Sequence, residues 1–245
     1  ISQERAHGDG IYVDFDSPEA LEEVFWRVHC RSKYIRDEHL CTHKVDPETV
    51  LALKRYQNNV CYKYGKPRYL AKNNNHILRI RSLAEALPDT CFLVLFRDPV
   101  SQAKSLLKQH NKFIDADTFT RRYMTWLAHH EFGATHRPFQ FFEHGKLNAD
   151  ASDLQYWIDR WTGAYAYLLD VLEENLPNLI PVSYEKLCNE PDYWGWLCYR
   201  LNIQYKPSPF RRLEEASHNE QNFSIDRSCA IYQKLMKIST RVTCT

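Results

Sequence analysis

Apolar and polar residues recur along the chain with two periods, one typical of strands and the other of helices. The short alternation over Ile11–Phe15 predicts a strand. The run Ser17-Pro18-Glu19 then supplies an N-cap, a proline at the first helical position and an early acid, so we expect a helix that extends to about Val28. The run Asp46-Pro47-Glu48 repeats this signal before apolar positions at helical spacing, which predicts a second helix.

The next segments predict strands and helices in alternation. Arg68–Lys72 is typical of a short strand, Asn73–Asn75 of a polar turn and Ile77–Leu87 of a helix. Cys91–Phe96 is a continuous apolar run of strand length, as in a parallel strand covered on both faces, so we expect it at the centre of its sheet. The run Arg97-Asp98-Pro99 ends this strand and begins a helix over residues 100–110.

Farther along the chain, helices are expected over residues 117–130, 153–175 and 192–201, and a strand over residues 179–184. The pattern weakens after Asn202, where no element is predicted. Strands that alternate with helices indicate an α/β fold with a parallel central sheet flanked by helices. The length and the even composition predict one domain over residues 1–245.

The charge balance and the cysteines limit the partners and the compartment. The chain has 32 Lys and Arg residues against 31 Asp and Glu residues, so it lacks a broad positive field for nucleic acid or an anionic membrane surface, and any anion site is local. No stretch is apolar for the roughly 18 residues that a membrane span needs. The eight cysteines are scattered and form no Cys-x-x-Cys motif, which predicts free thiols and a reducing, cytoplasmic compartment.

The densest group of potential metal ligands comprises His29, Cys30, His39, Cys41 and His43. Its spacing matches no standard zinc motif. We therefore interpret these side chains as structural and expect no metal.

The end of the predicted strand over Cys91–Phe96 carries the first candidate chemistry. Ligands of open parallel sheets bind outside the carboxyl ends of the strands, and Arg97 lies at such an end. Ser105 follows eight residues later, on the helix that Arg97 introduces. A guanidinium fork and a hydroxyl donor together suit a phosphate. By spacing alone, Arg97-Asp98-Pro99 is also explained as a helix start with a local ion pair.

These residues belong to a longer pattern that resembles the sulfotransferase superfamily. In order, the pattern comprises Leu70-Ala71-Lys72-Asn73, Leu83, Leu87-Pro88, Phe92–Val100 and Ser105-Leu106. Val182–Leu187 and Glu190-Pro191 resemble the later Tyr-Glu-x-Leu segment of that family, and Trp196-Leu197 and Leu201–Ile203 follow. The resemblance rests on the matching order of these pieces. It implies a P-loop NTPase-like α/β fold, and transfer of a sulfuryl group from 3′-phosphoadenosine 5′-phosphosulfate to a hydroxyl acceptor without a metal.

The resemblance assigns roles to four residues. It implies that Arg97 and Ser105 hold the 3′-phosphate of the donor and that Tyr184 approaches the same end of the molecule. It places Lys72 near the 5′ side, where an ammonium neutralises the charge that builds on the bridging oxygen as sulfuryl departs. Two plainer interpretations stay open, namely Tyr184 as a core tyrosine at a strand end and Lys72 as a solvated lysine.

Sulfuryl transfer also needs a base to take the proton of the acceptor hydroxyl. Several members of the family use a glutamate a short distance after the phosphate loop, which implies Glu4 as the base here, with His7 and Asp9 as rivals. His129-His130-Glu131 is a second titratable cluster, in which a histidine can titrate near neutrality. We interpret that cluster as the polar face of the helix over residues 117–130.

One part of the family pattern is missing from the sequence. No Gly-rich loop follows a strand and precedes a helix, although the family uses such a loop to bind the 5′-phosphosulfate through backbone amides. We expect the fold to be N-terminally truncated, with its first strand and this loop upstream of Ile1. The 245-residue chain by itself is then expected to bind the donor weakly and to transfer nothing.

Two other functions are compatible with the same residues. A phosphate-binding, kinase-like α/β enzyme would need a Gly-x-x-x-x-Gly-Lys-Ser/Thr loop and an acid for magnesium, and the sequence shows neither. A non-catalytic interaction domain would keep the sheet and use the aromatic-rich stretch from Trp126 to Trp161 as a partner surface. The acceptor is left open among a carbohydrate, a small alcohol or phenol, and a peptide tyrosine.

Overall fold

The computed structural model describes residues 2–4, 12–14, 22–141, 150–208, 210 and 223–241. The chain divides into two units, the first formed by residues 1–86 and 109–140 and the second by residues 87–108 and 141–245. Each unit combines helices with a pair of parallel strands, which confirms the predicted α/β class. One domain over residues 1–245 stays a prediction. None of the described helices is long and apolar enough to cross a lipid bilayer.

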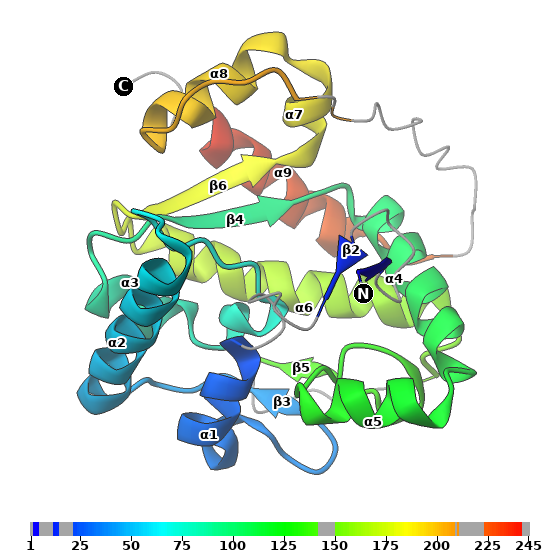
Figure 1. The fold of residues 1–245 in the computed structure, drawn as a ribbon. Helices are drawn as coiled ribbons and strands as arrows, with labels where there is room; N and C mark the ends of the chain where they lie inside the picture. The colour runs from blue at the N-terminus through cyan, green and yellow to red at the C-terminus, as the bar shows by residue number, and fades with distance from the viewer. Residues whose placement is uncertain are drawn as a thin grey trace. The chain divides into compact units, whose positions relative to one another are not determined.

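Two parallel strands form the sheet of the second unit. Strands β4 (Phe92–Phe96) and β6 (Leu179–Ser183) lie side by side and point the same way (Figure 1). Their register pairs Phe92 with Leu179 and Phe96 with Ser183. Both strands lie where the sequence predicts them, and the parallel direction is also as predicted.

The prediction that β4 is a central strand covered on both faces is wrong for the described part of the sheet. Val94 and Phe96 are buried, but Leu95 between them is 53% exposed. Successive side chains of a strand point to opposite faces, so only one face of β4 is packed at this point. Among the described strands, β4 pairs with β6 alone. A continuous apolar run therefore permits burial on both faces, but only packing partners from elsewhere in the chain can provide it.

The helices of the second unit follow the predicted order, with two additions. They are α4 (Pro99–Ile114), α6 (Leu154–Glu173), α7 (Tyr184–Asn189), α8 (Pro191–Arg200) and α9 (Asp226–Arg241), and the residues of α4 after Lys108 belong to the first unit. Helices α7 and α9 were not predicted. Helix α9 lies where the hydrophobic pattern weakens, yet it packs against α6 and β6 and buries Ile231 and Leu235.

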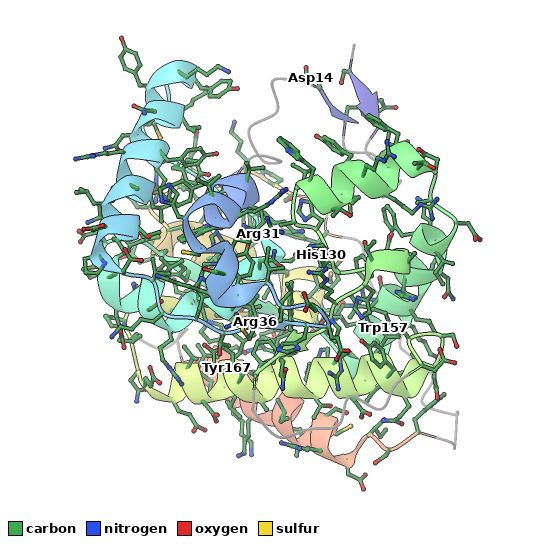
Figure 2. All side chains as sticks on the ribbon, turned by 90° about the horizontal axis from the view of Figure 1, so that it is seen from below. Asp14, Arg31, Arg36, His130, Trp157 and Tyr167 are labelled. Atoms are coloured by element: carbon green, nitrogen blue, oxygen red, sulfur yellow. The ribbon has the colours of Figure 1, made fainter. Side chains whose placement is uncertain are left out.

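Helix α6 is the longest of the described helices and supplies much of the core of the second unit. Asp153 begins it by accepting a hydrogen bond from the backbone N–H of Gln155 at 3.0 Å, and the sequence predicts a helix from this residue. Figure 2 shows Trp157 and Tyr167 on different turns of this helix, and both side chains are buried. The helix thus carries large aromatic side chains into the core along most of its length.

The first unit consists of shorter elements. They are β1 (Gln3–Glu4), β2 (Tyr12–Val13), α1 (Glu22–Tyr34), β3 (Leu40–Cys41), α2 (Pro47–Tyr64), the 3₁₀ helix η2 (Asn74–Leu78), α3 (Ile80–Ala86), α5 (Thr118–Trp126), the 3₁₀ helix η3 (Gly133–Thr135) and β5 (Phe139–Gln140). Strands β1 and β2 pair antiparallel, whereas β3 and β5 pair parallel with Leu40 opposite Phe139. Strand β2 lies inside the predicted strand, whose outer residues Ile11 and Phe15 lie outside the described residues.

The predicted helices of the first unit are present with altered ends. Helix α2 begins as predicted, because Asp46 accepts a hydrogen bond from the N–H of Thr49 at 2.8 Å, and it ends at Gly65 in a left-handed conformation with φ of 58°. Helix α1 continues past Val28, and its predicted start at Ser17 lies outside the described residues. Helix α5 ends at Trp126, earlier than predicted, and Ala128 just beyond it has a φ of 58°.

The prediction of a strand over residues 68–72 is wrong. No described strand lies alongside this segment to pair with its backbone, and side chains hold it instead. Tyr69 donates a hydrogen bond to Glu22 at 2.6 Å, and Asn73 donates one to Glu23 at 2.6 Å. Asn73 also caps η2 by accepting from the N–H of Asn75, so the predicted polar turn is the start of a helix. Helix α3 then completes the helix expected over residues 77–87.

A buried ion pair between two aromatic rings forms the centre of the first unit. One terminal nitrogen of Arg79 donates to both carboxylate oxygens of Glu23, at 3.0 Å each, and both side chains are almost fully buried. The guanidinium lies 4.3 Å from the ring centroid of Trp26 and 5.0 Å from that of Tyr34. Removing one partner of such a pair would leave an unpaired charge in the core, which costs about 3–5 kcal/mol.

A second buried carboxylate, that of Glu22, accepts three hydrogen bonds. Its donors are Tyr69 at 2.6 Å, Nε2 of His76 at 2.7 Å and Nε1 of Trp26 at 3.1 Å. Burial raises the pKa of a carboxyl group, but these hydrogen bonds, led by that from His76, outweigh burial and lower the pKa of Glu22 to about 2. An ionised Glu22 therefore ties α1 to the irregular segment that precedes η2.

We predict that Glu22 makes the first unit sensitive to acid. Its pKa falls from 4.5 to about 2 on folding, so its stabilising effect is present above pH 4.5 and is lost as the pH falls towards 2. On acidification over this pH range, the free energy of unfolding should decrease in both proteins. The decrease in Glu22→Gln should be smaller than that in the unchanged protein by about 3 kcal/mol. Denaturant unfolding at a series of pH values measures the difference.

The control variant is Glu38→Gln, which neutralises an exposed glutamate of the same unit and should follow the unchanged protein. Equal pH dependence of unfolding for Glu22→Gln and the unchanged protein would contradict the prediction.

Candidate functional site

The register of β4 and β6 brings two of the predicted site residues to one edge of the sheet. Phe96 pairs with Ser183, and each is the last residue of its strand, so Arg97 and Tyr184 leave the sheet beside each other. The guanidinium carbon of Arg97 lies over the ring of Tyr184, 5.6 Å from its centroid. At that distance the ring quadrupole attracts the cation. The structure therefore places Arg97 and Tyr184 together at the carboxyl ends of two parallel strands.

Asp98 and Pro99 begin α4 and leave Arg97 outside the helix. Oδ1 of Asp98 accepts a hydrogen bond from the N–H of Ser101 at 2.8 Å, as an N-cap does. Among the described residues, neither Asp98 nor any other acid forms an ion pair with Arg97. The helix start is therefore confirmed, whereas the local ion pair of the plainer interpretation is absent from the described contacts.

Arg97 keeps a buried donor without a partner. Its Nε atom is buried and has no hydrogen-bond partner among the described residues, although the rest of the side chain is partly exposed. A buried donor without a partner costs about 1–3 kcal/mol. An anion at the edge of the sheet would remove this cost and add the charge-assisted hydrogen bonds of a guanidinium. This unpartnered donor is the observation that fits the phosphate expected at Arg97.

Glu185 fixes the turn that carries Arg97, a role that its position in the sequence does not predict. Its Oε1 accepts from the backbone N–H of Asp98 at 2.8 Å, and its Oε2 accepts from the hydroxyl of Ser183 at 3.1 Å. Tyr232 of α9 also hydrogen-bonds this carboxylate, and burial together with the charge of Glu185 raises the pKa of Tyr232 above its usual range. One carboxylate thus joins the ends of β4 and β6 to α9.

Ser105 lies on the exposed side of α4, in the same unit as Arg97. The first half of α4 is anchored to α6 through Gln102, whose Oε1 accepts a hydrogen bond from Nε1 of Trp161 at 3.1 Å. Tyr165 of α6 donates to the backbone carbonyl of Leu95 at 2.8 Å. These contacts hold the end of β4 and the start of α4 against one helix. Of the described contacts, none joins Ser105 to Arg97, so their shared phosphate stays a prediction.

Lys72 lines a cavity of about 260 Å³ within the first unit. Its side chain is exposed, and two more cations, Lys66 and Arg68, line the same cavity. Glu22 and Tyr69 contribute the polar end of the lining, where they hydrogen-bond to each other. Among the charged side chains that line the cavity, cations outnumber carboxylates three to one, which favours an anionic occupant.

The proposed general bases gain no support from the described contacts. Glu4 lies on β1 and is exposed, and His7 and Asp9 lie outside the described residues. The role of Glu4 therefore stays a prediction.

The second titratable cluster is not the polar face of a helix, because α5 ends before it. His129 pairs with Glu131 at 3.4 Å, and Asn74 donates to the same carboxylate oxygen at 3.2 Å. Burial lowers the pKa of His129, but the contact with Glu131 outweighs burial and raises it overall. A histidine that holds its proton more tightly is a poorer base near neutrality. His129 and Glu131 thus form a partly buried ion pair beside η2.

Among the histidines and cysteines from His29 to His43, the two end histidines pack against aromatic rings. The ring of His29 lies 4.4 Å from that of Phe25, and His43 stacks on Tyr34 at 5.1 Å. In the described part of the chain, no group of three or more His, Cys, Asp and Glu side chains is arranged to hold a metal ion.

Comparison with known proteins identifies one related family. A family model described as "Sulfotransferase family" matches residues 20–206, which is more than half of the chain. No curated protein and no solved structure matches the chain. The matched range includes Lys72, Arg97, Ser105 and Tyr184, and it excludes Glu4 and His7.

We predict that Glu185 is the main support of the turn at Arg97. In Glu185→Ala, the N–H of Asp98 loses its acceptor and Tyr232 loses its partner, so the free energy of unfolding should fall by about 2–3 kcal/mol. Denaturant unfolding at neutral pH measures this change. The control is Glu190→Ala, because Glu190 is exposed and its side chain forms no capping hydrogen bond. A loss of stability no larger than that of the control would disprove this role.

Proposed function

Because the chain belongs to the sulfotransferase family, we propose that it transfers a sulfuryl group from 3′-phosphoadenosine 5′-phosphosulfate to a hydroxyl acceptor. Family membership supports a sulfotransferase activity in general. The donor is proposed on one observation in particular, the buried and unpartnered Nε of Arg97 at the carboxyl end of β4, beside Tyr184. Ligands of parallel sheets bind at this edge, and a guanidinium matches the oxygens of a phosphate.

The 3′-phosphate is the group of the donor that Arg97 is proposed to bind. It carries two negative charges and separates this donor from adenosine 5′-phosphates. Tyr184 holds the guanidinium from one side through its ring, and Glu185 fixes the backbone that carries it. Ser105 is proposed to add a hydroxyl donor from α4. In this arrangement Arg97 and Ser105 bind and orient the donor, and neither takes part in bond breaking.

The proposed reaction forms one bond to sulfur and breaks another. The acceptor oxygen bonds to sulfur while the bond between sulfur and the bridging phosphate oxygen breaks, and adenosine 3′,5′-bisphosphate departs with that electron pair. The acceptor proton passes to a base, for which Glu4 is proposed and His7 is the rival. The ammonium of Lys72 is proposed to neutralise the charge that develops on the bridging oxygen. These last roles follow from the resemblance of the residues to the family pattern.

We predict that Arg97→Met weakens the binding of adenosine 3′,5′-bisphosphate by about tenfold to a hundredfold, because a charge-assisted contact is lost. The affinity for adenosine 5′-monophosphate, which has no 3′-phosphate, should stay the same. Calorimetric titration of the full-length protein without magnesium measures both affinities. Arg200→Met removes an exposed arginine of the same unit and serves as the control.

Other results of these titrations would each exclude part of the proposal. If both nucleotides lose affinity equally, or if neither does, Arg97 does not bind the 3′-phosphate. Binding of ATP only in the presence of magnesium would favour a kinase-like enzyme. An absence of binding to any of these nucleotides would favour a non-catalytic domain.

We predict that Lys72→Met lowers kcat by about a hundredfold and leaves the affinity for adenosine 3′,5′-bisphosphate nearly unchanged, because the charge it neutralises develops only during transfer. Transfer from radiolabelled donor to a carbohydrate, a phenol and a tyrosine peptide measures kcat in the full-length protein. Lys66→Met is a matched control, since Lys66 lines the same cavity. An equal loss of kcat in both variants would mean that the general charge of the cavity, rather than Lys72, is responsible.

A further inference from the structure

Helix α5 carries two neighbouring stripes of exposed side chains. Phe119, Tyr123 and Trp126 recur at helical spacing and are 75%, 44% and 48% exposed. Thr118, Arg122 and Thr125 form a second stripe, shifted by one residue, and all three are exposed. None of the nine residues of α5 is buried. An amphipathic helix normally turns its apolar face to the core, so three large rings in solvent indicate a binding surface.

The three aromatic rings form a ladder with nearly parallel planes. The centroids of Phe119 and Tyr123 are 6.0 Å apart with planes 6° from parallel, and those of Tyr123 and Trp126 are 6.3 Å apart with planes at 21°. Rings that stack on one another along a helix are held in place before any ligand arrives. The ladder therefore offers a series of ordered apolar surfaces rather than one deep pocket.

A groove of about 440 Å³ runs along the polar stripe and reaches Trp126 at the end of the ladder. Three arginines line it, Arg27, Arg121 and Arg122, and no carboxylate does. Arg27 of α1 donates to the backbone carbonyl of Trp126, which fixes the end of α5 beside the groove. Of the described residues, none forms an ion pair with Arg121 or Arg122.

This excess of positive charge is local. Two other cations of the first unit have acidic partners, in the pair Lys33–Asp46 at 2.7 Å and in the buried pair Arg79–Glu23. The chain as a whole has a net charge of only +1. Guanidinium groups without acidic partners around one groove attract an anionic ligand to that groove in particular.

We propose that the groove and the aromatic ladder bind an acidic carbohydrate, a sugar chain that carries carboxylate or sulfate groups, as the acceptor of the reaction. The role as acceptor rests on the proposed function, whereas the binding itself does not. Arg121 and Arg122 hold the acidic groups through paired N–H donors, and Thr118 and Thr125 exchange hydrogen bonds with sugar hydroxyls. The flat apolar faces of pyranose rings lie on Phe119, Tyr123 and Trp126.

The observations favour a sugar over other acidic ligands. A nucleic acid is usually bound along an extended basic track, and the near-zero net charge provides none. Arginine clusters also bind acidic peptide motifs, but that mode of recognition does not account for the open row of stacked rings beside the arginines of α5. A membrane-binding helix inserts a broad apolar face, whereas a stripe of threonine and arginine borders the rings of α5. Stacked rings beside hydroxyls and guanidiniums suit a ligand that alternates apolar ring faces with hydroxyl and acidic groups.

Binding of oligogalacturonate to the full-length protein tests the proposal, with a neutral malto-oligosaccharide as the comparison ligand. We expect the acidic sugar to bind more tightly and to lose affinity as salt is added. The double variant Arg121→Gln/Arg122→Gln should lose at least about tenfold in affinity for the acidic sugar and should no longer prefer it over the neutral one. Phe119→Ala/Tyr123→Ala should weaken both sugars, because stacking does not depend on charge.

Two control variants remove similar groups elsewhere in the first unit. Arg31→Gln/Arg55→Gln removes two exposed arginines, and Figure 2 labels Arg31 on α1. Tyr62→Ala removes a tyrosine that is 91% exposed on α2. Both should bind the sugars as the unchanged protein does. Because no residue of α5 is buried, all of these variants should keep the circular dichroism spectrum of the unchanged protein.

The proposal is overturned if oligogalacturonate does not bind, or if the arginine control loses as much affinity as the α5 variant. It is also overturned if oligoglutamate, oligothymidylate or vesicles that contain phosphatidylserine bind through α5 more tightly than the sugar does. Adenosine 3′,5′-bisphosphate binding by the same α5 variants separates this proposal from the preceding one. If the α5 variants lose sugar binding and keep nucleotide binding, sugar binding at the groove is supported. If the unchanged protein binds the nucleotide and no sugar, sugar binding at the groove is rejected and the proposed function is not.

Discussion

The carboxylate of Glu185 is the contact on which the candidate phosphate site most depends. It accepts from the backbone of Asp98 after β4 and from the hydroxyl of Ser183 at the end of β6, and it hydrogen-bonds Tyr232 of α9. The parallel register already places the ends of both strands together. The shared acceptor then fixes the turn after β4, so that Arg97 leaves the sheet in one direction, over the ring of Tyr184.

In the first unit, the segment that carries Lys72 is held in place without strand pairing. The segment from Tyr69 to Asn73 has irregular backbone, and the two buried carboxylates of Glu22 and Glu23 hold it through side-chain hydrogen bonds. Because Glu23 also binds Arg79, the same residues stabilise the core and position the irregular segment. A lysine on such a segment can face a cavity, since the backbone around it is not paired with a strand. The core and the surroundings of Lys72 are thus one network.

The positive charge of the protein acts locally rather than as a general field. In a chain of net charge +1, cations lie at the sheet edge with Arg97, around the cavity with Lys72 and along α5. Lys33 and Arg79, by contrast, are neutralised by acidic partners. Such a distribution selects anions by position and geometry, which suits an enzyme that binds a charged donor better than a protein that binds a polyanion over its whole surface.

Features that depend on neighbouring residues could be predicted from the amino-acid sequence. Helix starts near Asp46, Asp117 and Asp153 were predicted, because each cap is formed within three residues of its own position. The strands over Phe92–Phe96 and Leu179–Ser183 and the position of Arg97 after the first of them were predicted from local apolar runs. The order of these motifs also indicated the family.

Only the tertiary structure decided which partners these elements meet. Glu185 lies 87 residues from Asp98, so no local pattern shows their hydrogen bond. The exposure of Leu95, the absence of a strand over residues 68–72 and the presence of α9 depend equally on distant segments that do or do not supply a packing surface. The aromatic positions of α5 are also typical of a core-facing helix, and only the fold leaves them in solvent. Caps and periodicity are set by adjacent residues, whereas burial, register and side-chain pairing are set by residues that the fold brings together from far along the chain.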